Sequence, residues 1–276
     1  MNFDMNAVWS RGIDLVRENF QLLAVIAAVF LLLPTLAIYL LIPDFQSFAE
    51  PGANPDVVAE KMGEILGPFI GIISITSLFQ FAGYGAMIAL MGDHRPTVGE
   101  ALGKGLMTVP SLIAVLILFA LAYMLGAFIV LIPFALLAAA IGVPGFAIVA
   151  IVPVLVFIVW LMARMSMTMP SLVLGNSLNP IKAITNSFKL TAPKQWSILL
   201  FWVMIIVAFM VISVLLNGVV SVFAALAGSG LGSLVIVGLA NGVTSMITGM
   251  VMCGLTAAMF GQLSGPSDAA IEETFG

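Results

Sequence analysis

Few side chains in this sequence are of types that do chemistry, and those present lack partners at a useful spacing. His94 is the only histidine and lies in a Gly-Asp-His-Arg-Pro turn beside Asp93. A catalytic or metal-binding histidine needs further ligands or a base, so a solvated loop residue is the favoured interpretation. Cys253 is the only cysteine, and its apolar neighbours indicate a thiol buried by packing.

Two further groups are candidates for ligand binding. Four methionines lie close together in the sequence: Met162, Met165, Met167 and Met169. Thioethers bind copper(I), but no cysteine or histidine accompanies these, so flexible packing is favoured. Asn241 lies between Gly238 and Gly242 in an apolar run, where a gate or substrate contact competes with a simpler hydrogen bond between helices. The sequence therefore predicts no cofactor, no metal and no catalytic residue.

The composition indicates a membrane protein. Of the 276 residues, 62% are hydrophobic and 8% are charged, whereas about a quarter of the residues in a soluble domain are charged. The formal net charge is −4, and no basic run is long enough to indicate binding to nucleic acid. The chain is expected to use lipid as its solvent.

Six apolar stretches are long enough to cross a hydrocarbon core about 30 Å thick. They cover about 20–42, 65–91, 109–131, 146–162, 197–223 and 231–260. The first is too long for a signal-peptide core of about 7 to 15 residues, so we expect it to be retained, with a kink at Pro34. The third ends at Pro133, and the short stretch 134–141 is either a re-entrant turn or a bent extension of that span.

Three short amphipathic helices with basic residues precede the first, third and fifth spans. Asn179 and Pro180 begin the last of these, and Thr97 with Glu100 forms a capping box for the second. We expect these helices to lie in the headgroup layer. Their predicted apolar stripes are Trp9, Ile13, Val16 and Phe20; Val98, Leu102 and Leu106; and Ile181, Ile184 and Phe188.

In the third amphipathic helix, Lys182, Thr185, Asn186 and Lys189 fall on the polar face. Pro193 is expected to end the helix, and Lys194 and Trp196 lie where the chain turns from the interface into hydrocarbon.

The three helices also suggest an internal repeat. Aligning Gly12, Ala101 and Ala183 gives offsets of 89 and 82 residues, and each unit then holds one amphipathic helix and two spans. Units of this kind point the same way and are related by an axis along the membrane normal. Chance similarity between helices that precede a span is the alternative.

Small residues within the spans predict close helix packing. Gly67-x-x-x-Gly71 and Gly238-x-x-x-Gly242, the latter with Asn241, are the two such motifs. The six apolar cores contain no Asp, Glu, Lys, Arg or His. Proton-coupled carriers keep such a group in the membrane, so we do not expect proton-coupled transport.

The basic residues predict the orientation. With the N-terminus inside, eight lie in cytoplasmic segments and only Lys61 lies outside; the eight are Arg11, Arg17, Arg95, Lys104, Arg164, Lys182, Lys189 and Lys194. Cytoplasmic segments are rich in Lys and Arg. We therefore expect one six-span domain, 1–264, and an acidic cytoplasmic tail, 265–276, with both termini in the cytoplasm.

The stretch 169–199 resembles a family of bacterial inner-membrane proteins: the membrane domain of some glycerophosphoryl diester phosphodiesterases, also found as stand-alone proteins. The resemblance is carried by Pro170, Ala183, Ser187, Leu190, Thr191 and Trp196. Gly175 and Asn176 depart from it, because many relatives have an acidic residue there. It implies a bacterial inner-membrane location, but not the phosphodiesterase activity, which belongs to a separate soluble barrel.

These observations predict an all-α, polytopic protein with six transmembrane and three interfacial helices that acts without catalysis, in a membrane-organising or accessory role. Its partners would be lipid headgroups or a membrane protein. The predicted contact residues are Arg11, Arg17, Lys182, Lys189, Lys194 and Trp196. A permease for a small apolar or zwitterionic substrate is the alternative. A membrane-embedded enzyme is less favoured, because no nucleophile is paired with a base and no metal-ligand spacing is present.

The orientation is tested by reporter fusions. A reporter after residue 50 should report the periplasm, and reporters near residues 100, 185 and 276 should report the cytoplasm, because of the eight-to-one distribution of basic residues. A cytoplasmic signal at 50 together with a periplasmic signal at 100 would overturn this orientation.

Overall fold

The computed structural model describes residues 3–42, 55–92, 96–143, 149–175, 177–228 and 230–265, with the backbone alone at 55–66 and 68. All regular structure in these ranges is helical. Six helical stretches among them are long and apolar enough to cross a membrane: Phe20–Leu41, Phe69–Leu90, Val98–Ile141, Ile151–Val173, Pro180–Leu226 and Leu231–Ser264. The predicted all-α fold class with six spans is confirmed, and the chain is an integral, multi-pass membrane protein. His94, Arg95, Asn176 and the tail from 266 lie outside the described residues.

The first span is interrupted at the predicted proline. Helix α1 (Met5–Glu18) leads into α2 (Phe20–Ala27), a π-helical turn η1 (Ala28–Leu32) and α3 (Leu33–Leu41). Proline lacks an N–H and its ring clashes with the carbonyl four residues earlier. The wider π turn just before the buried Pro34 accommodates both effects, and Leu33 N–H there donates to Ala28 O.

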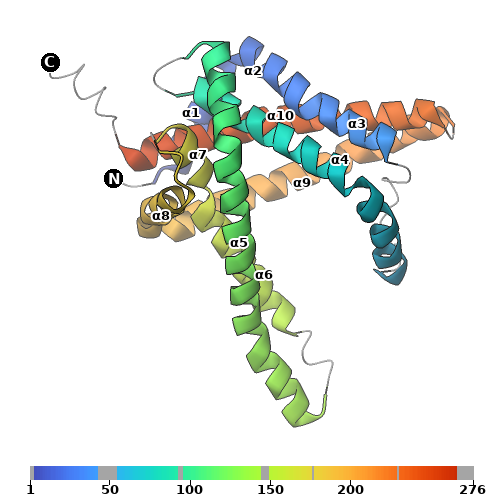
Figure 1. The fold of residues 1–276 in the computed structure, drawn as a ribbon, viewed down its shortest axis with the longest axis vertical. Coiled ribbons are helices and arrows are strands. Elements are labelled where there is room, and N and C mark those ends of the chain that lie inside the picture. The colour runs from blue at the N-terminus through green and yellow to red at the C-terminus, as the bar shows by residue number, and fades with distance from the viewer. Residues whose placement is uncertain are drawn as a thin grey trace.

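Helix α4 (Pro55–Leu90) begins earlier than expected. The second span was expected to begin at about residue 65, but residues 55–64 are helical as well. Proline at a first helical position has no N–H to leave unpaired, and no glycine or proline interrupts the next seven residues. Figure 1 shows the first turns of α4 running at an angle to the rest.

Helix α5 (Val98–Ile141) is continuous over 44 residues. The predicted capping box is present: Thr97 N–H donates to Glu100 Oε2 at 2.8 Å and Glu100 N–H donates to Thr97 Oγ1 at 3.4 Å. The predicted break at Pro133 is wrong, because membrane helices tolerate an internal proline. Residues 134–141 are thus an extension of the third span and not a re-entrant turn. The helix ends at Gly142, whose φ is +68°.

The remaining helices complete three further spans. Helices α6 (Ile151–Met165) and α7 (Thr168–Val173) are followed by α8 (Pro180–Thr191), the short 3-10 turn η4 (Ala192–Lys194), α9 (Gln195–Leu226) and α10 (Leu231–Ser264). The third amphipathic helix therefore ends at Thr191, two residues before Pro193. Gly228, with φ +77°, lies in the turn between α9 and α10.

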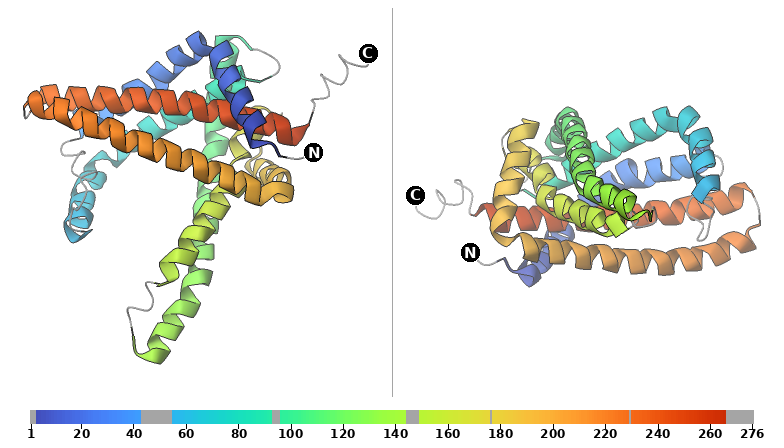
Figure 2. Two further views of the ribbon diagram at one scale, coloured as in Figure 1. Left: turned by 180° about the vertical axis from the view of Figure 1, so that it is seen from behind. Right: turned by 90° about the horizontal axis from the view of Figure 1, so that it is seen from below.

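The helices spread from one common region (Figure 1). This region, here termed the hub, contains α1, α7, α8, the start of α5 and the end of α10. Helices α2 to α4, α9 and α10 leave it in roughly one direction, whereas the α5–α6 hairpin leaves at a steep angle (Figure 2).

Close helix crossings lie beside the first span and at the hub. A Cβ on Gly238 would lie 2.8 Å from Leu36 Cδ1, and one on Gly242 would lie 3.1 Å from Leu32 O, so the predicted packing at this motif is found. A Cβ on Gly67 or Gly71 would meet nothing within 4 Å. In the described part of the chain these two glycines therefore make no close crossing, and the predicted packing there is not found.

Each of the three amphipathic segments buries one face, which contains small residues. The buried sets are Val8, Gly12, Leu15 and Val16 in α1; Ala101, Gly105 and Thr108 in α5; and Ala183, Ser187 and Thr191 in α8. Within the predicted apolar stripes, Trp9, Leu106 and Ile181 are 46%, 57% and 62% exposed, whereas Val16 is buried and Val98, Leu102 and Ile184 pack partly buried against the core. This exposure does not contradict the stripes, because the apolar face of an interfacial helix is directed to lipid. In a membrane, small side chains favour close contact between helices. Large apolar side chains are as stable against lipid acyl chains as against protein.

These buried faces pack in a cyclic order. The α5 segment packs on the end of α4, α8 packs on α6 and α7, and α1 packs on the end of α10. Each amphipathic segment thus rests on the second span of the preceding repeat unit, and the first rests on the last. The aligned positions Gly12, Ala101 and Ala183 are all buried, as a threefold repeat predicts.

The crossing of α1 and α10 predicts a position-specific effect of Gly254→Ala. The new Cβ would lie 2.5 Å from Gly12 O, so α1 must shift, at a cost of about 1–3 kcal/mol. Gly261→Ala in the same helix is the control, because its Cβ meets nothing within 4 Å. In thermal unfolding of the detergent-solubilised protein, the midpoint temperature of Gly254→Ala should lie well below that of Gly261→Ala. Equal midpoints would contradict this packing.

Candidate functional site

The buried polar side chains gather where α8 meets α6 and α7. Among the described residues, the buried polar side chains are Thr108, Thr168, Ser171, Ser187 and Thr191. Four of the five belong to α7 and α8. We term this place the α8 junction, and it lies within the stretch 169–199 and the end of α6.

Ser187 joins α8 to the end of α6. Its side chain is fully buried, and its hydroxyl donates to Arg164 O at 2.6 Å and accepts from Met167 N–H at 3.1 Å. The last carbonyls of a helix lack partners within that helix. One serine therefore bonds to a carbonyl in the last turn of α6 and to the N–H of Met167 just after that helix. These two bonds fix α8 against the end of α6.

Arg164 forms the second connection. Its Nη1 donates to Thr191 Oγ1 at 3.0 Å, and its guanidinium carbon lies 4.7 Å from the centre of the Phe188 ring. A cation over an aromatic face is stabilised by the ring's electron density. Its Nε is buried without a hydrogen-bond partner among the described residues. Arg164 is thus directed into the protein, where sequence reasoning placed it only as a cytoplasmic cation.

The start of α8 is fixed as predicted. Asn179 Oδ1 accepts from Ile181 N–H at 3.0 Å and from Lys182 N–H at 3.1 Å. Ahead of it, Ser111 Oγ donates to Leu178 O at 2.5 Å and ties this segment to α5. Asn186, expected on an exposed face, is half-buried and donates to Ser171 Oγ at 3.1 Å.

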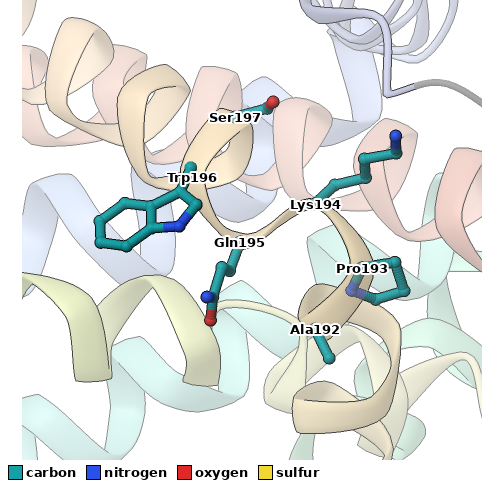
Figure 3. A pocket seen from close by; sticks show the side chains of 6 residues that line it. All are labelled: Ala192, Pro193, Lys194, Gln195, Trp196 and Ser197. Carbon is teal, nitrogen blue, oxygen red and sulfur yellow. The ribbon is translucent and has the colours of Figure 1, made fainter.

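The predicted contact residues of α8 lie on its outer side. Lys182 and Lys189 are exposed, and Lys194 is half-exposed in η4. Trp196 is 69% exposed at the start of α9, as suits an indole at a membrane interface. A hollow of about 220 Å³ is lined by residues 192–197, and Figure 3 shows Trp196 and Lys194 leaving this elbow in different directions.

The predicted contact residues of α1 lie on the same region of the molecule. Arg11 and Arg17 are exposed, and Arg11 Nη1 lies 3.1 Å from Glu18 Oε1, a surface pair of little energetic weight. Asp4 caps the helix, accepting from Asn6 N–H at 2.9 Å. Asp4 N–H also donates to Gln262 Oε1 at 3.3 Å, which ties α1 to the end of α10.

The other ligand candidates are dispersed or engaged in packing. Met167 is fully buried while Met162 is 52% exposed, so the four methionines do not line one path. Within the described residues no three His, Cys, Asp or Glu side chains form a group that could hold a metal. Cys253 is buried, with Sγ 3.8 Å from Tyr84 O.

Asn241 bridges two helices. Its Nδ2 donates to Val237 O at 3.0 Å and reaches Asn217 Oδ1 in α9 at 3.5 Å. This arrangement is the inter-helix hydrogen bond that sequence reasoning favoured over a gate.

No protein-family model, curated protein or solved structure matches the chain. The resemblance to the phosphodiesterase membrane domain stays a prediction. The residues that carry it gather at the α8 junction: Pro170, Ala183, Ser187 and Thr191 are buried there and Leu190 is half-buried. Sequence reasoning missed Arg164 and Ser171 as partners of α8. The small residues at positions 183, 187 and 191 were the available signal, since they mark one helix face.

Ser187→Ala tests the junction. The change leaves a buried carbonyl and a buried N–H without their partner, which costs about 1–3 kcal/mol. Ser221→Ala is the matched control, because Ser221 is exposed and bonds only to Gly218 O in its own helix. Chemical unfolding in detergent should show Ser187→Ala clearly less stable than Ser221→Ala. If the two variants unfold alike, Ser187 does not hold α8.

Proposed function

We propose that this protein is a non-catalytic component of a bacterial inner membrane, with both termini in the cytoplasm and the hub at the cytoplasmic surface. In this proposal the hub contacts lipid headgroups, or a membrane-protein partner, and so organises the membrane or assists another protein. The family resemblance at 169–199 supports the bacterial inner-membrane assignment.

The distribution of basic side chains carries the proposal. All seven basic residues whose side chains are described lie on elements of the hub or at its border: Arg11, Arg17, Lys104, Arg164, Lys182, Lys189 and Lys194. Four acidic side chains accompany them: Asp4, Asp14, Glu18 and Glu100. Each Lys or Arg near an anionic membrane surface contributes about 1 kcal/mol of attraction. A cationic face beside the ends of apolar spans is therefore suited to anionic headgroups.

The proposal includes no reaction. At the α8 junction, the most polar part of the described interior, the Ser187 and Thr191 hydroxyls are bonded to backbone carbonyls, and Thr191 also accepts from a guanidinium. An activated nucleophile needs an adjacent base, and these partners are not bases. The junction is better explained as a device that positions α8.

The alternative function, a permease, has one observation in its favour. A groove of about 480 Å³ lies between α9 and α10 at membrane depth, with aliphatic walls and the hydroxyls of Ser213, Thr244 and Thr248. Such a groove suits a small apolar substrate. Saturable flux of a small apolar solute into proteoliposomes would support the permease, and lipid binding without flux would support the accessory role.

Charge reversal on α8 tests the proposed function. Lys182→Glu combined with Lys189→Glu should weaken crosslinking to anionic headgroups in nanodiscs, since each lysine contributes about 1 kcal/mol. Both side chains are exposed, so the spans should stay inserted. The double Lys→Arg variant keeps the charge and is the control. Unchanged crosslinking in the double Glu variant would remove α8 from the lipid-contact surface.

A further inference from the structure

A crevice lies between the elbow that joins α8 to α9 and the end of α10. Its volume is about 320 Å³, and its walls are Phe3, Leu190, Pro193, Lys194, Gln262, Leu263, Ser264 and Gly265. The crevice lies at the level of the first residues of α9 and the last residues of α10, where the apolar part of each helix ends. Lipid headgroups and the glycerol region of a bilayer occupy this level.

The crevice is a feature of the repeat unit. A second crevice of about 360 Å³ lies between the start of α2 and the end of α4, lined by Glu18, Asn19, Leu22, Leu90 and Pro96. The alignment of Gly12 with Ala183 pairs Asn19 with Leu190 and Leu22 with Pro193. The first and third units therefore build a hollow from the same two positions of the elbow.

The middle unit has a hydrogen bond at the corresponding position. Its residue aligned with Leu22 and Pro193 is Ser111, whose hydroxyl donates to Leu178 O at 2.5 Å. The two open crevices differ in charge, because the first contains Glu18 and the third contains Lys194.

The described walls of the third crevice carry one cation and several neutral hydrogen-bond acceptors. Lys194 supplies an ammonium with three donor hydrogens, enough to share among several acceptors. The end of α10 supplies the negative end of a helix dipole and carbonyls without partners in their own helix. Ser264 Oγ donates to Phe260 O at 2.7 Å, so its lone pairs face outward as acceptors.

The other walls are apolar or already engaged. Phe3 packs edge-on against Phe201, with ring centres 6.1 Å apart, and with Leu190 and Leu263 it gives the crevice an apolar side. Gln262 is occupied by its reciprocal bonds to the Asp4 backbone, at 3.3 and 3.4 Å. The Asp4 carboxylate caps α1 and is absent from the described lining.

We propose that this crevice binds one phospholipid whose headgroup carries both a phosphate and a primary ammonium, as in phosphatidylethanolamine. The phosphate pairs with Lys194, the ammonium donates to Ser264 Oγ and the last carbonyls of α10, and the acyl glycerol lies along Phe3 and Leu263. This inference rests on the proposed lipid-contact function and names its lipid. A quaternary ammonium has no hydrogen to donate, and phosphatidylglycerol has no cation, so both fit less well.

Native mass spectrometry of the full-length protein, titrated separately with phosphatidylethanolamine, phosphatidylcholine and phosphatidylglycerol of matched chains, tests the proposal. We expect one tight phosphatidylethanolamine molecule per chain and weaker binding of the other two. Lys194→Gln should lower its affinity about tenfold, the loss expected for one charge-assisted hydrogen bond. Lys194→Arg, which keeps the positive charge at this position, should retain most of the affinity.

Three results would overturn the proposal. The first is phosphatidylglycerol binding as tightly as phosphatidylethanolamine, which indicates a general anionic surface; the proposed function would then stand and this site would not. The second is full affinity in Lys194→Gln, and the third concerns the apolar side. Leu263→Trp fills the apolar side without a change of charge, and it should also displace the lipid; if it retains full affinity, the lipid lies elsewhere.

Discussion

The structure depends on the close approach of three helix pairs at the hub, each made by small or hydroxyl-bearing side chains. Gly12 lies against Gly254 and Leu255, Gly105 lies against Ala82 and Ala86, and Ser187 bonds to the end of α6. In lipid there is no hydrophobic driving force between helices, so packing and hydrogen bonds must hold them together. Short side chains allow both, because they let backbones come near.

The cyclic order of these contacts gives the hub its geometry. Each amphipathic segment holds the next pair of spans against the preceding pair, so losing one contact would release a whole hairpin at the hub. The middle hairpin, α5–α6, is held at the hub in the same way and diverges from the other spans only beyond it (Figures 1 and 2). Its exposed Leu125 and Ile129 are suited to lipid or to another membrane protein.

The polar side of the same arrangement positions the cations. Arg164 is directed inward to Thr191 and Phe188, while Lys182 and Lys189 project from the opposite side of α8. One helix thus has an inner face that fixes it to the spans and an outer face that carries charge. The proposed lipid contact follows from this division, because a charged helix acts at a defined depth only if something holds it there.

The sequence predicted what depends on local chemistry. The six spans, the Thr97 and Asn179 caps, the irregularity at Pro34 and the Gly238 crossing follow from hydropathy or from single residues, and the structure has all of them. Sequence-based prediction was insufficient for features that depend on which molecule or segment covers a helix face. Hydrophobic periodicity marked Trp9, Leu106 and Ile181 as apolar-face residues, but in a membrane such a face does not reveal whether lipid or protein covers it.

Other features depended on distant segments. The inward orientation of Arg164, the Asn186–Ser171 bond and the elbow crevices combine residues from different helices, and no local pattern reports them. The break predicted at Pro133 was wrong because lipid offers no hydrogen-bond partners to the backbone. An apolar segment in lipid therefore remains helical even at a proline.

The depth of α8 in a bilayer tests the central claim most directly. Nitroxide labels on cysteines placed at Thr185, which is exposed, and at Ala183, which is 3% exposed, would be compared in proteoliposomes by their accessibility to oxygen and to a water-soluble nickel complex. Native Cys253 is buried and can be replaced by alanine. The account predicts a mobile label at headgroup depth at 185 and an immobilised label, shielded from both reagents, at 183. Equal mobility and equal accessibility of the two labels would show that α8 is not packed against the spans, and would contradict the claim that the hub holds α8 at headgroup depth.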